Sequence, residues 1–316
     1  MATVAPPTLP GHPARPAAQP RHPSRSLVPW LLLAPTVAVL LVLTGYPLVK
    51  LVITSTQRYG REQVFGAPPE FVGLDNYRAV LTDPTFWTVL GRSVAFCAVN
   101  VVLTMSLGML VALLLTKLHR GMRLLVTVGL LLAWAMPALT SIVIWSWMFD
   151  AQYGVVNWLL THAGLDYAGH SWLIEPLSFF AVATLVITWQ SVPFVAFTLY
   201  AALTQVPDDV LEAAQLDGAS AGQRLRLVVV PFIKPILLIV TVLQVIWDLR
   251  VFTQIFALQD SGGVTSKTST IGVYIYQVGV AQGRFDVGSA IAVVMVVLML
   301  AASLFYVRQI VRTEEL

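Results

Sequence analysis

The sequence predicts an all-α membrane protein with six transmembrane helices. Of its 316 residues, 57% are hydrophobic and only 11% are charged, so a charged shell around an apolar interior cannot be built in water. Uncharged runs recur along the chain, and most reach the roughly 20 residues that a helix needs to cross a bilayer. One short polar interval, Glu212 to Pro231, interrupts them between the fourth and fifth runs.

The N-terminal segment differs from the rest of the chain. Residues 1–26 are rich in proline and carry Arg15, Arg21 and Arg25, which predicts a disordered cytosolic tail because little apolar surface can be buried. The following apolar run begins late and is long enough to span, unlike a cleaved signal peptide. We therefore expect residues 27–316 to form one transmembrane domain.

The spans follow from the uncharged runs. The fifth is interrupted by Lys234, Asp248 and Arg250, but its apolar density and the even spacing of the runs favour a crossing. The predicted spans are residues 27–53, 93–116, 124–148, 178–204, 227–258 and 287–310.

Basic residues predict the orientation. Two dense basic loops, Lys117 to Arg123 and Arg224 to Lys234, fall on the same side as the basic tail, whereas Asp150 to Glu175 contains no lysine or arginine. Because cytosolic loops are enriched in lysine and arginine, both termini are predicted to be cytosolic. The protein would then be a multi-pass protein of a bacterial cytoplasmic membrane.

The sequence gives no sign of catalysis within the chain. It has one cysteine, Cys97, its five histidines show no metal-binding spacing, and it contains no G-x-x-x-x-G-K-[ST] phosphate loop. We expect no catalytic residues, no metal and no cofactor. The net charge of +3 is too small to argue for nucleic acid.

The segment 207–231, which contains the polar interval, has residues that favour the start and the end of helices. Pro207 suits a first helical position, and the Asp208–Asp209 pair favours the positive end of a helix dipole. Gly218 is suited to a left-handed stop, and Ser220 with Gln223 is typical of a capping box that starts a second helix. Two short helices joined by a turn are therefore predicted between the fourth and fifth spans.

This interval resembles the EAA loop of permease subunits of bacterial ATP-binding-cassette (ABC) importers. Glu212, Ala213 and Ala214 are followed after three residues by Gly218, and after nine more by Val228-Val229-Val230-Pro231. The family usually ends this motif with Ile-x-Leu-Pro, so the two outer valines are conservative departures. The residues of this chain that match the loop are Glu212, Ala213, Ala214, Asp217, Gly218 and Pro231.

The resemblance covers nearly everything after residue 26. Asp217-Gly218-Ala219, the GLDNY run at 73–77, Tyr46-Pro47 and the stretch from Arg250 to Ala290 are similar to the carbohydrate branch, and specifically to the first permease subunit of glycerol-phosphate and oligosaccharide importers. That subunit often carries Gly-Gly-Pro in its last outer loop. Here Gly262-Gly263 is followed by Val264.

The resemblance implies a type I ABC importer permease fold and a set of partners. These are a second homologous permease, two copies of a cytosolic ABC ATPase, an extracytoplasmic sugar-binding protein and a sugar or oligosaccharide substrate. In the family the EAA helices dock as coupling helices into a cleft of the ATPase, so ATP would be hydrolysed by a separate subunit. Glu212 and Gly218 match the positions most closely tied to that docking.

Polar and aromatic residues inside the spans are the candidates for substrate contact, because sugars are held by stacking on their apolar face and hydrogen bonds around the rim. These candidates are Trp189, Gln190, Gln244, Trp247, Asp248, Arg250 and Gln254. Asp248 and Arg250 are two residues apart, so they are poorly placed to pair on a helix. Either they line a cavity, or the fifth helix breaks nearby and both charges reach the interface.

Two other functions compete with the importer permease. A secondary transporter driven by an ion gradient should show repeated halves or paired membrane carboxylates, and Asp248 is the single acid that the sequence places within the spans. A non-transporting membrane receptor or scaffold would not need the coupling loop.

Overall fold

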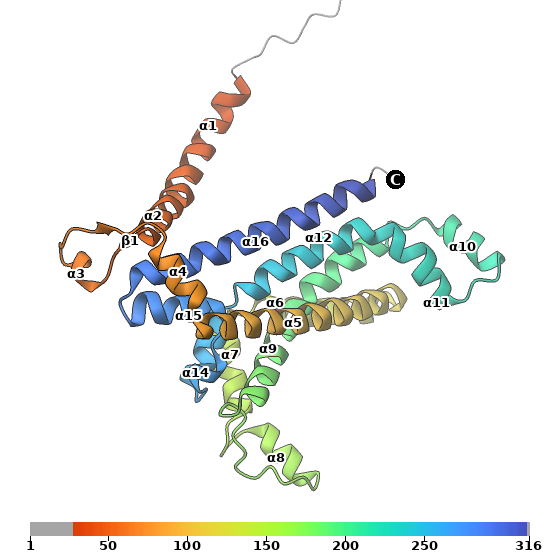
Figure 1. Cartoon of the computed structure of the whole chain (residues 1–316). Helices are drawn as coiled ribbons and strands as arrows, with labels where there is room; N and C mark the ends of the chain where they lie inside the picture. The colour runs from red at the N-terminus through yellow and green to blue at the C-terminus, as the bar shows by residue number, and fades with distance from the viewer. Residues whose placement is uncertain (1–27, 315–316) are drawn as a thin grey trace, which may run out of the picture. The chain divides into compact units, whose positions relative to one another are not determined.

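The computed structural model describes residues 28–314, and the predicted disordered tail over residues 1–26 lies outside them. The described chain is helical apart from one short antiparallel hairpin that pairs Gln57 with Phe71 and Arg58 with Glu70 (Figure 1). Its elements, with η marking π-helical segments, are α1 (Val28–Leu40), η1 (Leu41–Gly45), α2 (Tyr46–Ser55), β1 (Gln57–Arg58), α3 (Arg61–Val64), β2 (Glu70–Phe71), α4 (Asp75–Thr82), α5 (Pro84–Lys117), α6 (Arg120–Ala135), α7 (Ala138–Met148), α8 (Val155–His162), α9 (Pro176–Leu203), α10 (Asp208–Leu216), α11 (Ala221–Arg224), η2 (Leu225–Val229), α12 (Val230–Leu249), α13 (Thr253–Asp260), α14 (Thr265–Thr268), α15 (Ile271–Tyr276), η3 (Gln277–Ala281) and α16 (Phe285–Glu314).

The chain divides into two compact units, Met1–Val49 and Lys50–Leu316. The described part of the first unit contains α1, η1 and the start of α2. The second contains every other element. The first helix long and apolar enough to span is Trp30–Ser55, where the sequence predicts a span over residues 27–53.

Five helices of the described chain are long and apolar enough to span, and a sixth span is possible if the bent pair α6 and α7 counts as one. The predicted span over 124–148 corresponds to the pair α6 and α7, which meet at an angle of 100° and so do not form one straight helix. Pro137 explains the break, since a proline disfavours helical backbone at the residue before it. Met136 accordingly has φ −69° and ψ 127°.

The second span starts earlier than predicted. The predicted span began at residue 93 because Arg92 ends the uncharged run. The helix α5 begins at Pro84 and runs for 34 residues. Asp83 caps it by accepting a hydrogen bond from the backbone N–H of Thr85 at 2.8 Å, and proline suits the first helical turn. The single arginine therefore lies within a continuous helix.

The fifth predicted span differs at both ends. The observed helix begins with α11 at Ala221 and continues through η2 into α12. The predicted start, residue 227, therefore lies inside this helix. At its other end α12 stops at Leu249, and a short break precedes α13. The helix break that the sequence left as an alternative near Asp248 and Arg250 is present.

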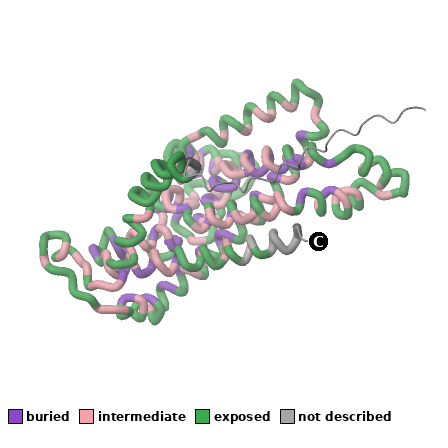
Figure 2. The backbone as a smooth tube through the Cα atoms, turned by 90° about the horizontal axis from the view of Figure 1, so that it is seen from above, coloured by how far each residue is buried: buried purple, intermediate pink, exposed green. Residues whose placement is uncertain are grey.

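The buried side chains of the second unit form several clusters, and one of them lies between α5, α9 and α12, where α5 packs along α9. Buried side chains along these helices include Ala112, Val195 and Leu199. In Figure 2 buried positions follow the long helices, while the connecting segments are mostly exposed. Close approach of α5 and α9 depends on Gly108, where an added Cβ would lie 2.5 Å from Cγ1 of Val195.

Candidate functional site: an exposed polar helix and a cavity between the spans

The polar interval forms the short helix α10 between the fourth and fifth spans. Pro207 is the residue before its first turn rather than the predicted first helical residue. Asp208 and Asp209 occupy the first turn, as predicted. Gly218 has φ +84°, the left-handed conformation that glycine adopts at little cost. The predicted start and stop signals therefore bound this helix.

The surface of α10 is open to solvent. No residue of the helix is buried, and Glu212, Ala213, Asp217 and Gly218 are all exposed. Val210 and Leu216 are also exposed, the latter by 88%. An exposed helix with both apolar and acidic side chains offers a surface for another protein rather than for its own core.

The second predicted helix is not separate. Ser220 and Gln223 form the predicted capping box, with the Ser220 N–H donating to Gln223 Oε1 at 2.8 Å and the Gln223 N–H donating to Ser220 Oγ at 3.4 Å. The helix that starts there continues through η2 into the fifth span. Pro231 lies in the first turn of α12 directly after η2, and because proline has no N–H to donate, the helical ladder is interrupted there.

Side-chain contacts hold α10 against the start of the fifth span. Arg224 Nη1 donates to Gln215 Oε1 at 2.6 Å. On the inner side of the helix, half-buried Leu211 packs against Val206, Val229 and Ile233. A displacement of α10 would therefore be transmitted to the ends of α9 and α12. Figure 1 shows α10 and α11 at the end of the bundle where α5 ends.

A cavity of about 420 Å³ lies where two helix breaks, α6–α7 and α12–α13, meet the middle of α9. The cavity wall includes Trp134 and Ala138, which lie on either side of the α6–α7 break. It also includes Ile187, Ser191 and Phe194 of α9. The remaining wall comes from the end of α12 and the start of α13. Of the seven predicted pathway residues, the cavity brings together Gln190, Trp247, Asp248, Arg250 and Gln254.

Gln190 has a structural contact as well as a place in this wall. Its Nε2 donates to the carbonyl oxygen of Met136 at 2.8 Å. That carbonyl lies at the break between α6 and α7, where the helical hydrogen-bond pattern is lost. The cavity wall and the broken span are thus joined by one side chain.

Asp248 is held by its neighbour one turn earlier. Gln244 Nε2 donates to Asp248 Oδ1 at 3.0 Å, and the two side chains are 1% and 4% exposed. Gln244 therefore lies behind the wall instead of lining it. Arg250 is exposed, and in the described chain the one ion pair joins Arg58 to Glu70, so Asp248 and Arg250 do not pair.

Trp189 does not line the cavity. Its ring makes an edge contact with Trp145, with centroids 5.7 Å apart. The sequence reading also missed Trp134, Phe194 and Phe252, which do line it. Phe194 lies edge-on to Trp247 at 4.9 Å. Phe194 follows Gln190 by four residues on α9, so helical spacing was a usable signal for it. Trp134 and Phe252 lie next to the two helix breaks and had no such signal.

Comparison with known proteins identifies the family. Residues 104–313 match the family model described as "Binding-protein-dependent transport system inner membrane component". The match covers the C-terminal part of α5, every element from α6 to η3 and nearly all of α16, and so includes both the exposed helix and the cavity.

Curated relatives and solved structures agree with this match. The chain is 42% identical to the diacetylchitobiose uptake system permease protein DasB of Streptomyces coelicolor, with 92% of this chain and 88% of the relative covered. It is 32% identical to the trehalose/maltose transport system permease protein MalF of Thermococcus litoralis, covering 88% and 92%. A crystal structure of a bacterial ABC transporter involved in alginate import shares the fold, with a TM-score of 0.76 at 21% identity over 91% of this chain and 96% of that one.

The two competing functions, a secondary transporter and a receptor without transport activity, are not supported by these relatives. Both the family match and the long alignments include the exposed helix that the sequence singled out. The chain belongs to the family of binding-protein-dependent transport system inner membrane components, with the fold of ABC importer permeases.

Proposed function

We propose that this chain is the permease subunit of an ATP-driven importer that moves a sugar or oligosaccharide across the bacterial cytoplasmic membrane. Relatives named for diacetylchitobiose, trehalose/maltose and arabinooligosaccharide transport support this substrate class. Diacetylchitobiose is the first substrate to test, because the relative named for it is 42% identical.

The observation that carries the proposal is the exposed EAA segment of α10. Glu212, Ala213 and Ala214 lie on a helix that has no buried residue of its own and is held to the fifth span by the Gln215–Arg224 contact. Small residues permit close approach by another backbone, and Glu212 offers a charge at the contact. We assign α10 as the coupling helix, with Asp217 and Gly218 fixing its end and Pro231 beginning the regular helix beyond η2.

The partners follow from this assignment. ATP is hydrolysed by two copies of a cytosolic ABC ATPase, one of which receives α10, and this chain itself needs no cofactor. A second homologous permease completes the pathway, and an extracytoplasmic binding protein delivers the sugar. Both termini are cytosolic in this arrangement, on the same side as α10.

The cavity is the proposed sugar pathway in this chain. Trp247 and Phe194 offer apolar faces for stacking, while Gln190, Asp248, Arg250 and Gln254 offer donors and acceptors for hydroxyl groups. Gln244 positions the Asp248 carboxylate through their hydrogen bond. Trp189 supports this wall only from behind, through Trp145.

The test is uptake by the complete transporter in proteoliposomes, with radiolabelled diacetylchitobiose and the binding protein present. Glu212→Lys should abolish ATP-dependent uptake and release the ATPase during purification, while the amount of permease in the membrane stays unchanged. Glu62→Lys, which makes the same charge change on an exposed residue of α3, should leave uptake and ATPase retention intact.

Two results would contradict the proposal. Uptake that continues with ATP depleted would point to an ion gradient as the energy source. Full ATP-dependent uptake by Glu212→Lys would remove α10 from the coupling contact. If the proteoliposomes do not take up diacetylchitobiose but do take up another oligosaccharide in an ATP-dependent way, only the proposed substrate is wrong.

A further inference from the structure

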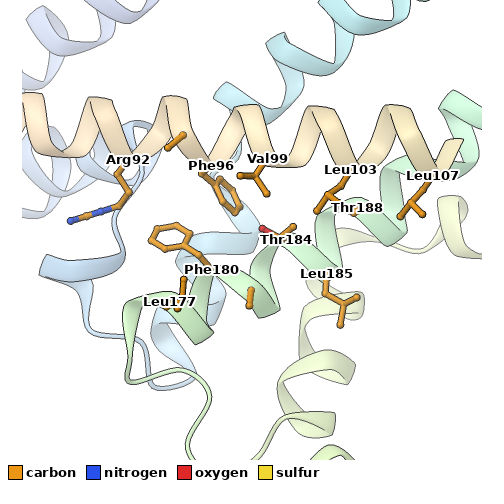
Figure 3. Close-up of a pocket in the computed structure, with 12 residues that line it drawn as sticks. Arg92, Phe96, Val99, Leu103, Leu107, Leu177, Phe180, Thr184, Leu185 and Thr188 are labelled. Carbon is orange, nitrogen blue, oxygen red and sulfur yellow. The ribbon is translucent and has the colours of Figure 1, made fainter. Parts of the chain in front are cut away.

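A second cavity lies on the side of the bundle, in a groove between α5 and α9. Its volume is about 570 Å³, and nearly all of its wall is apolar, with Phe96, Val99 and Leu103 on α5 and Phe180 and Leu185 on α9 (Figure 3). Arg92 is the one charged residue in the wall, and Figure 3 shows it at one end of the groove. This cavity shares no residue with the proposed sugar pathway.

The groove opens sideways. Leu103, Leu107, Leu177 and Leu185 of its wall are all exposed, Leu177 by 86%. Small side chains at Ala95 and Ala181 leave the space between the two helices unfilled. Because both helices are candidate spans, the groove lies at the depth of the hydrocarbon region, and its open side is not covered by any other part of the described chain.

The position of Arg92 along α5 places it near a headgroup layer. It is 25 residues from Lys117 at the end of the helix, a rise of about 38 Å. The hydrocarbon core is about 30 Å thick and the bilayer with its headgroups about 40–45 Å. Lys117 and Arg92 therefore lie at opposite interfaces, and from Arg92 the groove runs about 22 Å along the helix to Leu107.

Arg92 has no acidic partner. The one ion pair in the described chain joins Arg58 to Glu70. Arg92 Nη1 donates to the backbone carbonyl of Ser269 at 3.0 Å, which fixes the guanidinium at the end of the groove. A guanidinium has five N–H donors, so donors remain for an anion, and the planar group suits phosphate well.

We propose that this groove binds one anionic phospholipid, with the phosphate at Arg92 and one acyl chain lying between α5 and α9. A transmembrane helix of a partner fits less well. A helical cylinder 10 Å wide and 22 Å long has a volume of about 1,700 Å³, roughly three times the space available. A partner helix could only rest on the rim, whereas a single acyl chain can enter the groove.

The experiment measures lipids that stay with the complete transporter. The complex is purified in detergent, mixed with vesicles of phosphatidylglycerol and phosphatidylcholine in equal amounts, re-isolated and analysed by mass spectrometry. The wild type should retain phosphatidylglycerol in preference to phosphatidylcholine. Arg92→Gln should lower that retention about fivefold, the effect expected of one arginine near an anionic lipid surface.

Two further variants separate the site from general effects. Ala181→Phe fills the groove without changing charge and should lower retention of both lipids. Arg78→Gln removes an exposed arginine from α4 and should behave as the wild type. Each variant is compared at equal yield and thermal stability, so that a folding defect is not mistaken for lost binding.

Equal retention by the wild type, Arg92→Gln and Ala181→Phe would overturn the proposal. So would cross-linking of the Leu103→Cys variant to another polypeptide in the intact membrane, because a partner helix would then cover the groove. Reaction of the Leu103→Cys variant with a lipid-dissolved maleimide, and loss of that reactivity when phosphatidylglycerol is added, would support the proposal.

Discussion

Gln190 on α9 donates a hydrogen bond from Nε2 to the carbonyl oxygen of Met136 at 2.8 Å, across the break between α6 and α7. The two residues are far apart in sequence, and Pro137 favours the break because it disfavours helical backbone at Met136. In a bilayer an unpaired carbonyl has no water to replace its partner. This bond therefore both stabilises the break and fixes one wall of the cavity.

Replacing Gln190 with leucine should lower the free energy of unfolding by about 1 kcal/mol, the net contribution of one hydrogen bond, because the bond to Met136 is only partly buried. Thermal unfolding in detergent would show this as a lower Tm. Gln205→Leu is the control, since Gln205 is exposed and donates only to Ala201 one turn earlier. Equal Tm values for the two variants would show that the bond to Met136 contributes nothing.

Gly108→Ala tests the contact between α5 and α9. The new Cβ would lie 2.5 Å from Cγ1 and 2.8 Å from Cβ of Val195, so the helices must separate, at a cost of about 1–3 kcal/mol. In the double variant Gly108→Ala/Val195→Ala, Cγ1 of residue 195 is removed, and part of the lost Tm should be restored. Gly129→Ala has open space around it on α6 and should be neutral or slightly stabilising.

Gly218→Ala tests the end of the coupling helix without touching its charges. Nothing lies within 4 Å of an added Cβ, but φ is +84°, which costs a non-glycine residue about 1–2 kcal/mol. We expect weaker ATPase retention and slower uptake at an unchanged amount of permease in the membrane. Gly222→Ala also meets open space, without positive φ, so a matching loss in that variant would contradict this explanation.

Asp83 predicts a response to acid. Burial alone would raise its pKa, but the Thr85 backbone N–H, the hydroxyls of Thr85 and Tyr274, and the charge of Arg284 outweigh burial and lower the pKa below 3.8. A lowered pKa in the folded state adds stability above pH 3.8, which is lost as the pH falls through the folded pKa.

Asp83→Asn should therefore have a lower Tm than the wild type at pH 7, and the difference should shrink as the pH falls below about 4. Tm measured from pH 3 to 7 checks this. Asp166→Asn removes an exposed acid from the loop after α8. Its Tm should differ from that of the wild type by the same amount at every pH. A constant difference between Asp83→Asn and the wild type at all pH values would exclude the ionised carboxylate as the cause.

Val264→Pro tests the departure from the Gly-Gly-Pro pattern. Val264 has φ −81° directly before α14, close to the value that proline imposes, and the preceding Gly263 has no Cβ to clash with the ring. The substitution should raise the free energy of unfolding by about 0.4–1 kcal/mol by restricting the unfolded chain. A lower Tm would show that the loop needs the Val264 side chain or its N–H.

The sequence alone determined the class of the protein and the position of its polar helix. The apolar runs predicted the spans because a bilayer requires continuous apolar helix. The start and stop of α10 were predicted from Asp208, Asp209 and Gly218, since dipole and left-handed preferences act within one turn. The same local signals identified the capping box at Ser220 and Gln223.

The tertiary structure decided what these elements form together. The bend of 100° between α6 and α7, and the hydrogen bond by which Gln190 reaches across it, depend on packing between segments far apart in the chain. The break after Leu249 brings Arg250 and Gln254 to the same cavity as Asp248, and the groove beside Arg92 exists only because α5 and α9 lie side by side. Local preferences act over a few residues, whereas cavities arise from contacts between segments far apart in the chain.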